Sequence, residues 1–469
     1  MKELFFFDDW MLRESRGLDR KYGRPGQIKE VIIKKHPELE LIRGATKIYY
    51  DGDVSKYVTY MDCTQKSDKT RFLVRIESED PGDWPELQFA SGGEPMWKRV
   101  KNGSVIMDQY GNPLSCFNML SLKDTPLAKK GYFINFYRYQ NSNGRHNAAI
   151  GFSRDGVHID VDDKTSWIPY FSDTTNPAYY DPGTGQFIIY CRPGFVDRRV
   201  AIVTSADLRT FSEPIVVIQP DSEDPVGREF YGMEAVSVGD GMHIGILSIY
   251  DTEPTEKAWP KMQGVSNTYL AYGHNAYNWY RGSREPFLAR TGAGTPFGGQ
   301  VYCGPPILFP DNTWNFGVMG SAVEHGVAVE KDVPPEWKQT WKTYQYRLRL
   351  DGFAYLRTRA RLGMNQTKAV IPDGGEMTVN ARTAISGHVK VAALDEKTLE
   401  PIENFTLDDS VPVKGDELFG KVCWRNRDNL DELKGRPVIF EVRLKEGELY
   451  ALRFSYRMPI VDPPAPEQK

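Results

Sequence analysis

Two acidic residues lie in short polar segments that each come before a β-hairpin pattern. Asp173 begins the segment Asp173-Thr174-Thr175-Asn176, and Glu234 ends the segment 228–234. Two carboxyl groups that meet in one site could cleave a glycosidic bond, because one protonates the leaving oxygen while the other acts as nucleophile or activates water. We expect Glu234 to be the acid, since the aromatic and apolar residues before it would desolvate its carboxyl group and raise its pKa. Asp173 would then be the base, nucleophile or charge stabiliser.

Both carboxylates also have a purely structural interpretation. Glu234 could form a salt bridge with Arg228 or Lys47. Asp173 could accept hydrogen bonds from its own turn, as aspartates at turns often do. The sequence leaves both interpretations open.

Polar and cationic residues near the same expected strand ends are candidates for binding a substrate. The cations could clamp a carboxylated, sulfated or phosphorylated group through charge-assisted hydrogen bonds, and a tyrosine could stack on a sugar ring. Ion pairing within the protein is the alternative for the cations. The candidate binding residues are Arg43, Lys47, Asn176, Arg192, Arg228, Tyr231, Gln300 and His325.

Composition excludes several other kinds of function. Lys and Arg number 59 against 63 Asp and Glu, which leaves a net charge of −4 and argues against nucleic acid or an anionic membrane as partner. The five cysteines lie far apart, without the spacing of a zinc site or a disulfide framework, and no histidine spacing suggests a metal. We therefore expect no metal and no cofactor. The cysteine pattern and the absence of a signal-peptide core predict a cytoplasmic protein.

A repeated pattern indicates the elements that would position these residues. Alternating aromatic and β-branched runs around tight turns predict five hairpins. Strands that end in Asp-containing turns follow several of them, as at Asp155 and Asp207. These two turns resemble Asp-box turns, which lie at the periphery of a blade and serve folding. The hairpins lie at 47–60, 114–139, 178–190, 236–250 and 307–319.

A hairpin with an added outer strand, repeated five times, predicts an all-β fold, a five-bladed β-propeller. An irregular double-layer sandwich is the alternative. The pattern changes near residue 346, and later alternating runs such as 438–442 and 449–454 predict a small antiparallel β-sandwich. We therefore expect a propeller domain over 1–345 and a sandwich domain over 346–469.

These features resemble glycoside hydrolases that carry a five-bladed propeller and an appended sandwich, as in families 32, 43 and 68 and their unclassified relatives. The matching segments include 4–10, 172–181, 231–233, 281–287 and 349–353. The resemblance implies that Asp9, in the opening segment, is the catalytic base. The Asn-Asp-Pro-Asn, Arg-Asp-Pro and Glu-Cys patterns of invertases are absent, which argues against fructan specificity.

The residues and the resemblance together predict a glycosidase that acts on an oligosaccharide without a cofactor. A propeller that binds carbohydrate without catalysis is the alternative, and a scaffolding propeller is a third. Propellers serve all of these roles, so the site has to decide among them.

Overall fold

The computed structural model shows an all-β protein, as the sequence predicts. It describes residues 2–31, 36–44, 47–114, 117–139, 146–161, 167–172, 174–193, 197–239, 241–252, 264–325 and 341–459. Within these residues the regular elements are β-strands and three short 3-10 helices. The helices are η1 (Met96–Arg99), η2 (Ala128–Lys130) and η5 (Asp431–Leu433).

The chain divides into two compact units. The larger unit spans Arg24–Leu348, and the smaller one combines Met1–Gly23 with Arg349–Lys469. The boundary predicted from the sequence lies at 345/346, and the larger unit ends at Leu348. The first 23 residues differ from the prediction, because they belong to the smaller unit.

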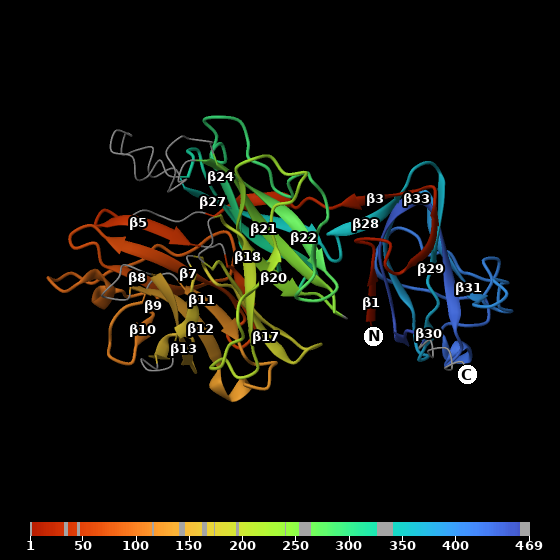
Figure 1. The fold of residues 1–469 in the computed structure, drawn as a ribbon, viewed down its shortest axis with the longest axis horizontal. Helices are drawn as coiled ribbons and strands as arrows, with labels where there is room; N and C mark the ends of the chain where they lie inside the picture. Colours follow the sequence, from red (N-terminus) through yellow and green to blue (C-terminus); the bar gives the residue numbers. More distant parts are fainter. Residues whose placement is uncertain are drawn as a thin grey trace, which may run out of the picture. The chain divides into compact units, whose positions relative to one another are not determined.

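The larger unit begins with two antiparallel sheets that follow each other along the chain (Figure 1). The first consists of β5 (Leu39–Gly44), β6 (Tyr49–Asp51), β7 (Lys56–Gln65), β8 (Arg71–Ser78) and β9 (Ser104–Val105). The second consists of β10 (Met107–Asp108), β11 (Phe117–Ser121), β12 (Tyr132–Tyr139), β13 (His146–Ser153), β14 (His158–Val161) and β15 (Trp167–Phe171), with β10 paired in parallel to β14.

A four-stranded and a nine-stranded sheet complete this unit. The four-stranded sheet consists of β16 (Ala178–Asp181), β17 (Gln186–Cys191), β18 (Val200–Ser205) and β19 (Ile215–Ile218). The nine-stranded sheet consists of β20 (Arg228–Ser237), β21 (His243–Thr252), β22 (Gly264–Gly273), β23 (Trp279–Arg281), β24 (Gln300–Cys303), β25 (Ile307–Leu308), β26 (Thr313–Ser321), β27 (Lys342–Arg349) and β4 (Gly26–Glu30).

The nine-stranded sheet has two antiparallel parts. One parallel pair, Ser266 opposite Gln300, joins β20–β23 to the part that contains β24–β27. Strand β4, from the beginning of the unit, pairs with β27 at its end. Residues from both ends of the larger unit therefore share one sheet.

Local sequence explains why the predicted hairpins form. In the hairpin at 178–190, Tyr179 lies opposite Ile188 and both side chains are buried. The Asp181 carboxylate closes the turn, because it accepts hydrogen bonds from Gly183 N at 3.1 Å and Thr184 Oγ1 at 2.7 Å. The other four predicted hairpins are present as β6–β7, β11–β12, β20–β21 and β25–β26.

Apolar side chains pack each sheet of the larger unit against the next. One cluster joins Leu73 of β8 to Ile159 of β14, and another joins Phe133 of β12 to Phe187 of β17. A third joins Ile188 of β17 to Met233 of β20. After the last part of the nine-stranded sheet, Phe309 lies in a cluster with the first sheet, with its ring 5.0 Å from that of Tyr57.

The smaller unit is built around two long strands, β31 (Thr378–Asp395) and β33 (Val438–Phe454), which pair antiparallel. Its other strands are β1 (Lys2–Phe5), β2 (Leu12–Arg16), β3 (Leu18–Tyr22), β28 (Ala354–Thr358), β29 (Leu362–Thr367), β30 (Ile371–Pro372), β32 (Asp416–Lys421) and β34 (Tyr456–Arg457). Its core includes Phe6, Trp424, Phe440 and Phe454.

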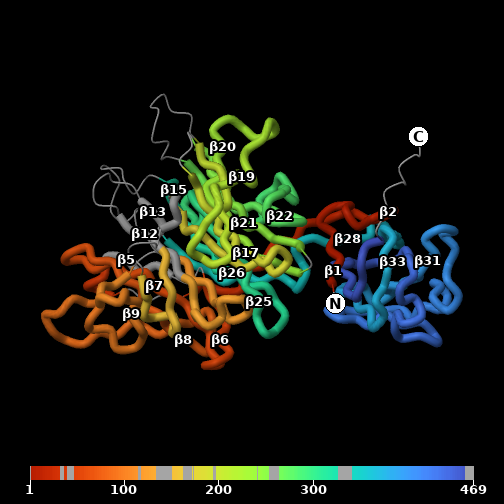
Figure 2. The backbone as a smooth tube through the Cα atoms, turned by 60° about the horizontal axis from the view of Figure 1, so that its bottom comes forward, coloured from red at the N-terminus to blue at the C-terminus, as the bar shows by residue number. Residues whose placement is uncertain are grey.

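Strand pairing explains why the N-terminal segment lies in the smaller unit. Strand β1 pairs with β33, β2 with β29, and β3 with β28. Figure 2 shows this segment in red among the blue strands. These pairs link opposite ends of the chain, so local sequence patterns carried no sign of them.

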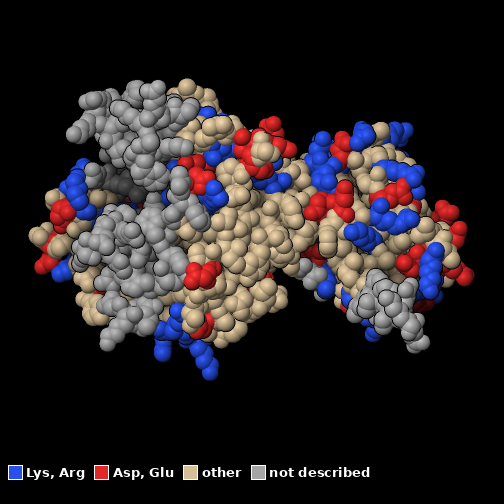
Figure 3. All heavy atoms as spheres, viewed as in Figure 1, with Lys and Arg blue, Asp and Glu red and all other residues tan. Residues whose placement is uncertain are grey.

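The surface of the smaller unit carries both charge signs. On the face shown in Figure 3, its lysine and arginine side chains lie among aspartate and glutamate side chains. Such mixing gives no extended field of one sign, in line with the near-neutral net charge. No helix among the described residues is long and apolar enough to cross a membrane.

Candidate active site

Polar side chains from four successive parts of the larger unit meet at Glu234. Glu234 lies on β20, Lys47 lies just before β6, Asn118 lies on β11, and Thr175 lies before β16. Lys47 Nζ is 3.6 Å from Glu234 Oε2, and Thr175 Oγ1 donates a hydrogen bond of 3.3 Å to Glu234 Oε1. The Lys47 ammonium also donates to Asn118 Oδ1. Residues far apart in sequence thus form one contiguous polar cluster.

Two polar atoms of this cluster have no hydrogen-bond partner within the described part of the chain. They are Glu234 Oε2 and Asn118 Nδ2, and both are buried. Buried polar atoms are rarely left unsatisfied, because each costs about 1–3 kcal/mol. One acceptor and one donor of the cluster thus lack a hydrogen bond within the described protein, which makes them candidate contacts for a ligand hydroxyl.

Lys47 supplies the positive charge of the cluster. Its side chain is partly exposed, at 26 %, and its backbone carbonyl accepts a hydrogen bond of 2.9 Å from Thr59 Oγ1, which fixes the segment before β6. Burial lowers the pKa of Lys47, and the nearby Glu234 carboxylate opposes this effect. The Glu234 carboxylate therefore helps Lys47 to keep its charge.

The conformation of β20 aims Glu234 at this cluster. Met233 points into the apolar core, so the next residue, Glu234, points to the other side of the strand. The pairing with β21 shifts between Phe230 and Gly232, which marks a β-bulge beside Tyr231. A Cβ atom at Gly232 would lie 3.1 Å from Thr174 Oγ1, so glycine lets the segment before β16 approach β20 closely.

Aromatic and basic side chains surround Tyr231 next to this cluster. The Tyr231 ring lies 4.7 Å from the Arg192 guanidinium and 5.6 Å from that of Arg198. The Tyr231 hydroxyl is 3.1 Å from His325 Nε2, and the Tyr250 hydroxyl is 3.4 Å from His325 Nδ1. Arg192 Nη1 also donates a hydrogen bond of 3.0 Å to Tyr231 O. These contacts hold Tyr231 in one orientation.

Strand β24 contributes the remaining side chains near Tyr231. The Tyr302 ring lies 5.9 Å from that of Tyr231, and its hydroxyl donates a hydrogen bond of 3.0 Å to Gln300 Oε1. Gln300 Nε2 donates to Val323 O at 2.9 Å, which orients the amide. Burial raises the pKa of the Cys303 thiol, and the Glu234 charge adds to the effect, so Cys303 stays protonated and unreactive.

The chain is similar to several solved structures, all at low sequence identity and low TM-score. No family model matches the chain, and no curated protein matches it in sequence. The chain is similar in structure to glycoside hydrolases. One is an exo-β-1,3-galactanase from Phanerochaete chrysosporium, with 9 % identity over 91 % of this chain and 99 % of that chain, at a TM-score of 0.41. Another is a glycosyl hydrolase from Bacteroides ovatus, with 14 % identity over 74 % of this chain and 96 % of that chain, at a TM-score of 0.42. A mannose phosphorylase from Leishmania mexicana shows 9 % identity over 68 % of this chain and 88 % of that chain, at a TM-score of 0.41.

Several predicted site residues come together, and Asn176 has a structural role within this site. Lys47 contacts Glu234, and Tyr231 contacts Arg192 and His325. Asn176 is buried with a positive φ of 48°, and its side chain holds the turn. Its Oδ1 accepts from Ser172 Oγ at 2.6 Å, and its Nδ2 donates to Thr174 O at 2.7 Å.

Other predicted residues lie elsewhere. Arg228 pairs with Asp251 at 2.7 Å and with Asp224 at 3.3 Å, so its guanidinium belongs to a separate ion-pair network. Asp9 lies in the smaller unit and forms an ion pair with Arg20. Asp173 and the side chain of Arg43 lie outside the described residues.

Sequence reasoning missed Asn118 and Arg198 as parts of the site, and it included Thr175 only as a member of the polar segment 173–176. Asn118 is a single polar residue between Phe117 and Met119 at the start of an expected strand, and that break in the apolar run was the available signal. Arg198 offered no such signal, since it reaches Tyr231 from a loop. Among the described residues, no group of three or more His, Cys, Asp and Glu side chains is arranged to hold a metal ion.

Proposed function

We propose that this protein is a glycoside hydrolase that cleaves an oligosaccharide and uses Glu234 as a catalytic residue. The observation that carries the proposal is the convergence of Lys47, Asn118, Thr175 and Glu234 from four sheets or sheet parts. A carboxylate oxygen that accepts no hydrogen bond, in the same cluster as an amide group with an unused donor, suits the recognition and attack of a hydroxylated ring.

The proposed architecture is a five-bladed propeller with an appended sandwich. Five successive antiparallel groups of strands, from β5–β9 to β24–β27 with β4, would be the blades. The packing of each sheet on the next, and of Phe309 on Tyr57, supports a ring of blades. In such a ring the inner strands face a common axis, where Glu234, Lys47 and Asn118 would lie. The long strands β31 and β33 would form the sandwich.

Lys47 bears on the role of Glu234. Lys47 Nζ lies 3.6 Å from one carboxylate oxygen of Glu234, and Thr175 Oγ1 donates a hydrogen bond to the other, so both neighbours are donors and the carboxylate is placed as an acceptor. We therefore propose Glu234 as nucleophile or base, and the acid role expected from the sequence is the alternative. In this proposal Asp173, which follows Ser172 and precedes Thr174, supplies the second carboxyl group.

Replacing Glu234 by glutamine tests the proposal. Glutamine keeps the size of the side chain but cannot act as nucleophile or base. The rate of hydrolysis of an oligosaccharide that the wild type cleaves should therefore fall by roughly 10²–10⁴-fold. A screen of aryl glycosides and oligosaccharides would first identify the substrate. Glu79→Gln is the matched control, because Glu79 is exposed and lies outside the site. Turnover of the Glu234→Gln variant within tenfold of the wild type would refute the role of Glu234.

Leaving-group dependence separates the two possible roles of Glu234. An enzyme that has lost its acid still cleaves substrates whose leaving group needs no proton, such as dinitrophenyl glycosides. An enzyme that has lost its nucleophile or base cleaves neither kind. We expect Glu234→Gln to be inactive on both, and activity on the activated substrate alone would return Glu234 to the acid role.

Phosphorolysis is a second candidate function. The observation that favours it is that the guanidinium groups of Arg192 and Arg198 both lie near the Tyr231 ring, which also contacts His325. Arginine is well suited to holding phosphate. Formation of a sugar 1-phosphate when inorganic phosphate is added would identify this reaction. Binding of sugar without any turnover would instead identify a carbohydrate-binding propeller.

The cytoplasmic location stays a prediction. The four cysteines that the structure describes, Cys63, Cys191, Cys303 and Cys423, are free thiols, which is compatible with a reducing compartment.

A further inference from the structure

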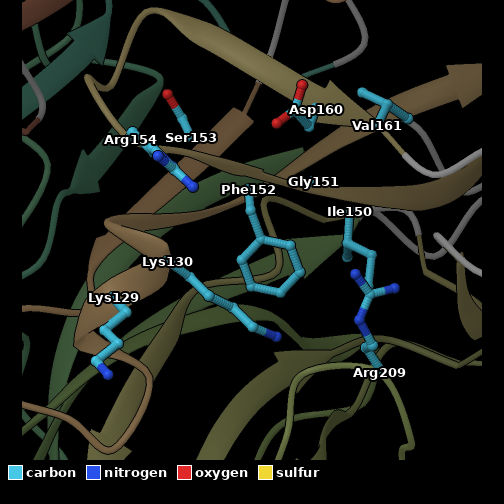
Figure 4. A pocket seen from close by; sticks show the side chains of 10 residues that line it. All are labelled: Lys129, Lys130, Ile150, Gly151, Phe152, Ser153, Arg154, Asp160, Val161 and Arg209. Carbon is cyan, nitrogen blue, oxygen red and sulfur yellow. The ribbon is translucent and has the colours of Figure 1, made fainter.

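A pocket of about 330 Å3 lies on the second sheet, away from Glu234. Helix η2 and strands β13 and β14 form most of its wall, and the turn after β18 adds Arg209 (Figure 4). Its volume falls at the lower end of the range of about 300–1,000 Å3 that is usual for small-molecule sites. It shares no lining residue with the site around Glu234. Ten residues line it: Lys129, Lys130, Ile150, Gly151, Phe152, Ser153, Arg154, Asp160, Val161 and Arg209.

Positive charge dominates the lining of this pocket. Lys129, Lys130, Arg154 and Arg209 oppose a single carboxylate, that of Asp160. Lys130 Nζ lies 4.3 Å from the centre of the Phe152 ring, and the Arg209 guanidinium lies 5.5 Å from it. Figure 4 shows the Phe152 ring beside both side chains. Two cations are thus held next to one aromatic ring.

The two cations next to Phe152 repel each other. Burial lowers the pKa of Lys130, the charge of Arg209 lowers it further, and Asp207 offsets part of the effect. No ion pair joins Lys129, Lys130 or Arg154 to any residue that the structure describes, although surface lysines and arginines commonly find one. A bound anion would relieve this repulsion.

Phe152 and Asp160 indicate which class of anionic ligand this pocket would bind. They lie opposite each other on the paired strands β13 and β14, so their side chains share one face of the sheet. An aromatic ring and a carboxylate in the lining of one pocket suit a sugar, whose ring packs on the aromatic face and whose hydroxyls donate to the carboxylate.

We propose that this pocket binds a small anionic sugar. Lys130, Arg209 and Arg154 would hold its carboxylate, sulfate or phosphate group, Phe152 would contact its ring, and Asp160 would accept a hydroxyl hydrogen bond. The pocket shares no residue with the site at Glu234, so this proposal does not depend on the proposed hydrolysis.

Calorimetric titration of the full chain at low salt tests this proposal with three probes. They are inorganic phosphate, glucose 6-phosphate and glucuronate. We expect glucose 6-phosphate or glucuronate to bind more tightly than inorganic phosphate, and the affinity to fall as salt is added. Absence of binding by all three would overturn the proposal. Equal affinity for inorganic phosphate and both sugars would overturn the assignment of a sugar.

Variants place the binding in this pocket. Lys130→Met keeps the apolar stem against Phe152 and removes the charge, so the Kd for the tighter sugar should rise roughly tenfold or more. Lys123→Met is the control, because Lys123 is exposed, lies in the same segment and loses the same charge. Arg154→Gln is a second variant at an exposed position, with the same expected loss. Unchanged affinity in a folded Lys130→Met or Arg154→Gln variant would overturn the proposal.

Discussion

The ion pair between Lys47 and Glu234 predicts an energetic coupling between the two side chains. At 3.6 Å two unit charges attract each other by about 4–5 kcal/mol at an effective dielectric constant of about 20, and by about 1 kcal/mol in water. The side chains are 26 % and 14 % exposed, which places the pair between these limits. We expect a coupling energy of about 1–3 kcal/mol.

A double-mutant cycle measures this coupling. Lys47→Met leaves the Glu234 carboxylate without its cation, and Glu234→Gln leaves the ammonium of Lys47 without its carboxylate. Each single variant should therefore lose about half of this coupling, roughly 0.5–1.5 kcal/mol of unfolding free energy. The double variant buries no unpaired charge, and isosteric replacement of a buried pair is often neutral or stabilising. Its unfolding free energy should return close to that of the wild type.

Chemical denaturation of the four proteins gives the free energies, and the glycosidase assay gives the activities. We expect the double variant to be as stable as the wild type, because no unpaired charge is left. We expect it to be inactive, because the proposed reaction needs the Glu234 carboxylate. The reasoning would be refuted if the coupling were below about 0.5 kcal/mol, or if the double variant were less stable than either single variant.

Three further predictions concern other parts of the larger unit. Burial lowers the pKa of His243, so the unfolded chain takes up a proton near pH 6.5 that the folded protein does not, and stability should fall as pH drops from 7 to 5. The slope of Tm against pH should be smaller in His243→Gln, and an equal slope would contradict this. Asp155→Ala should lower the unfolding free energy by about 1–3 kcal/mol with turnover unchanged, because the Asp155 carboxylate accepts hydrogen bonds from Val157 N at 2.9 Å and His158 N at 2.8 Å. Gly232→Ala should lower kcat about tenfold with little change in Tm, because its Cβ would displace Thr174; unchanged kcat would show that this approach is not needed.

Local sequence patterns were sufficient for the hairpins and for part of the site. Alternating residues around Asp-Gly and Asp-Pro-Gly turns specify β6–β7 and β16–β17, because both the strands and their turns are encoded within about 15 residues. The structural interpretation of Glu234 named Lys47 and Arg228 as alternative salt-bridge partners, and in the structure the partner is Lys47, while Arg228 pairs with Asp251.

Long-range pairing was the part that the sequence could not supply. The alternation in β1 is compatible with a strand in either unit, and only its register with β33 decides. Arg228 was expected near a substrate, but Asp251, on the strand paired with its own, takes up its guanidinium. Asn118 joins the site only because β11 lies next to Lys47 in space.

The divided composition of the smaller unit determines when it can fold. Strands β1 to β3 are synthesised before the larger unit, and their partners β28, β29 and β33 are synthesised after it. Such contacts have high contact order, so their formation is slow, and the first 23 residues stay unpaired while the larger unit is made. Deleting residues 349–469 would therefore leave β1, β2 and β3 without their partner strands. Unpaired strand edges promote aggregation, so the remaining chain would not behave as a single well-folded domain.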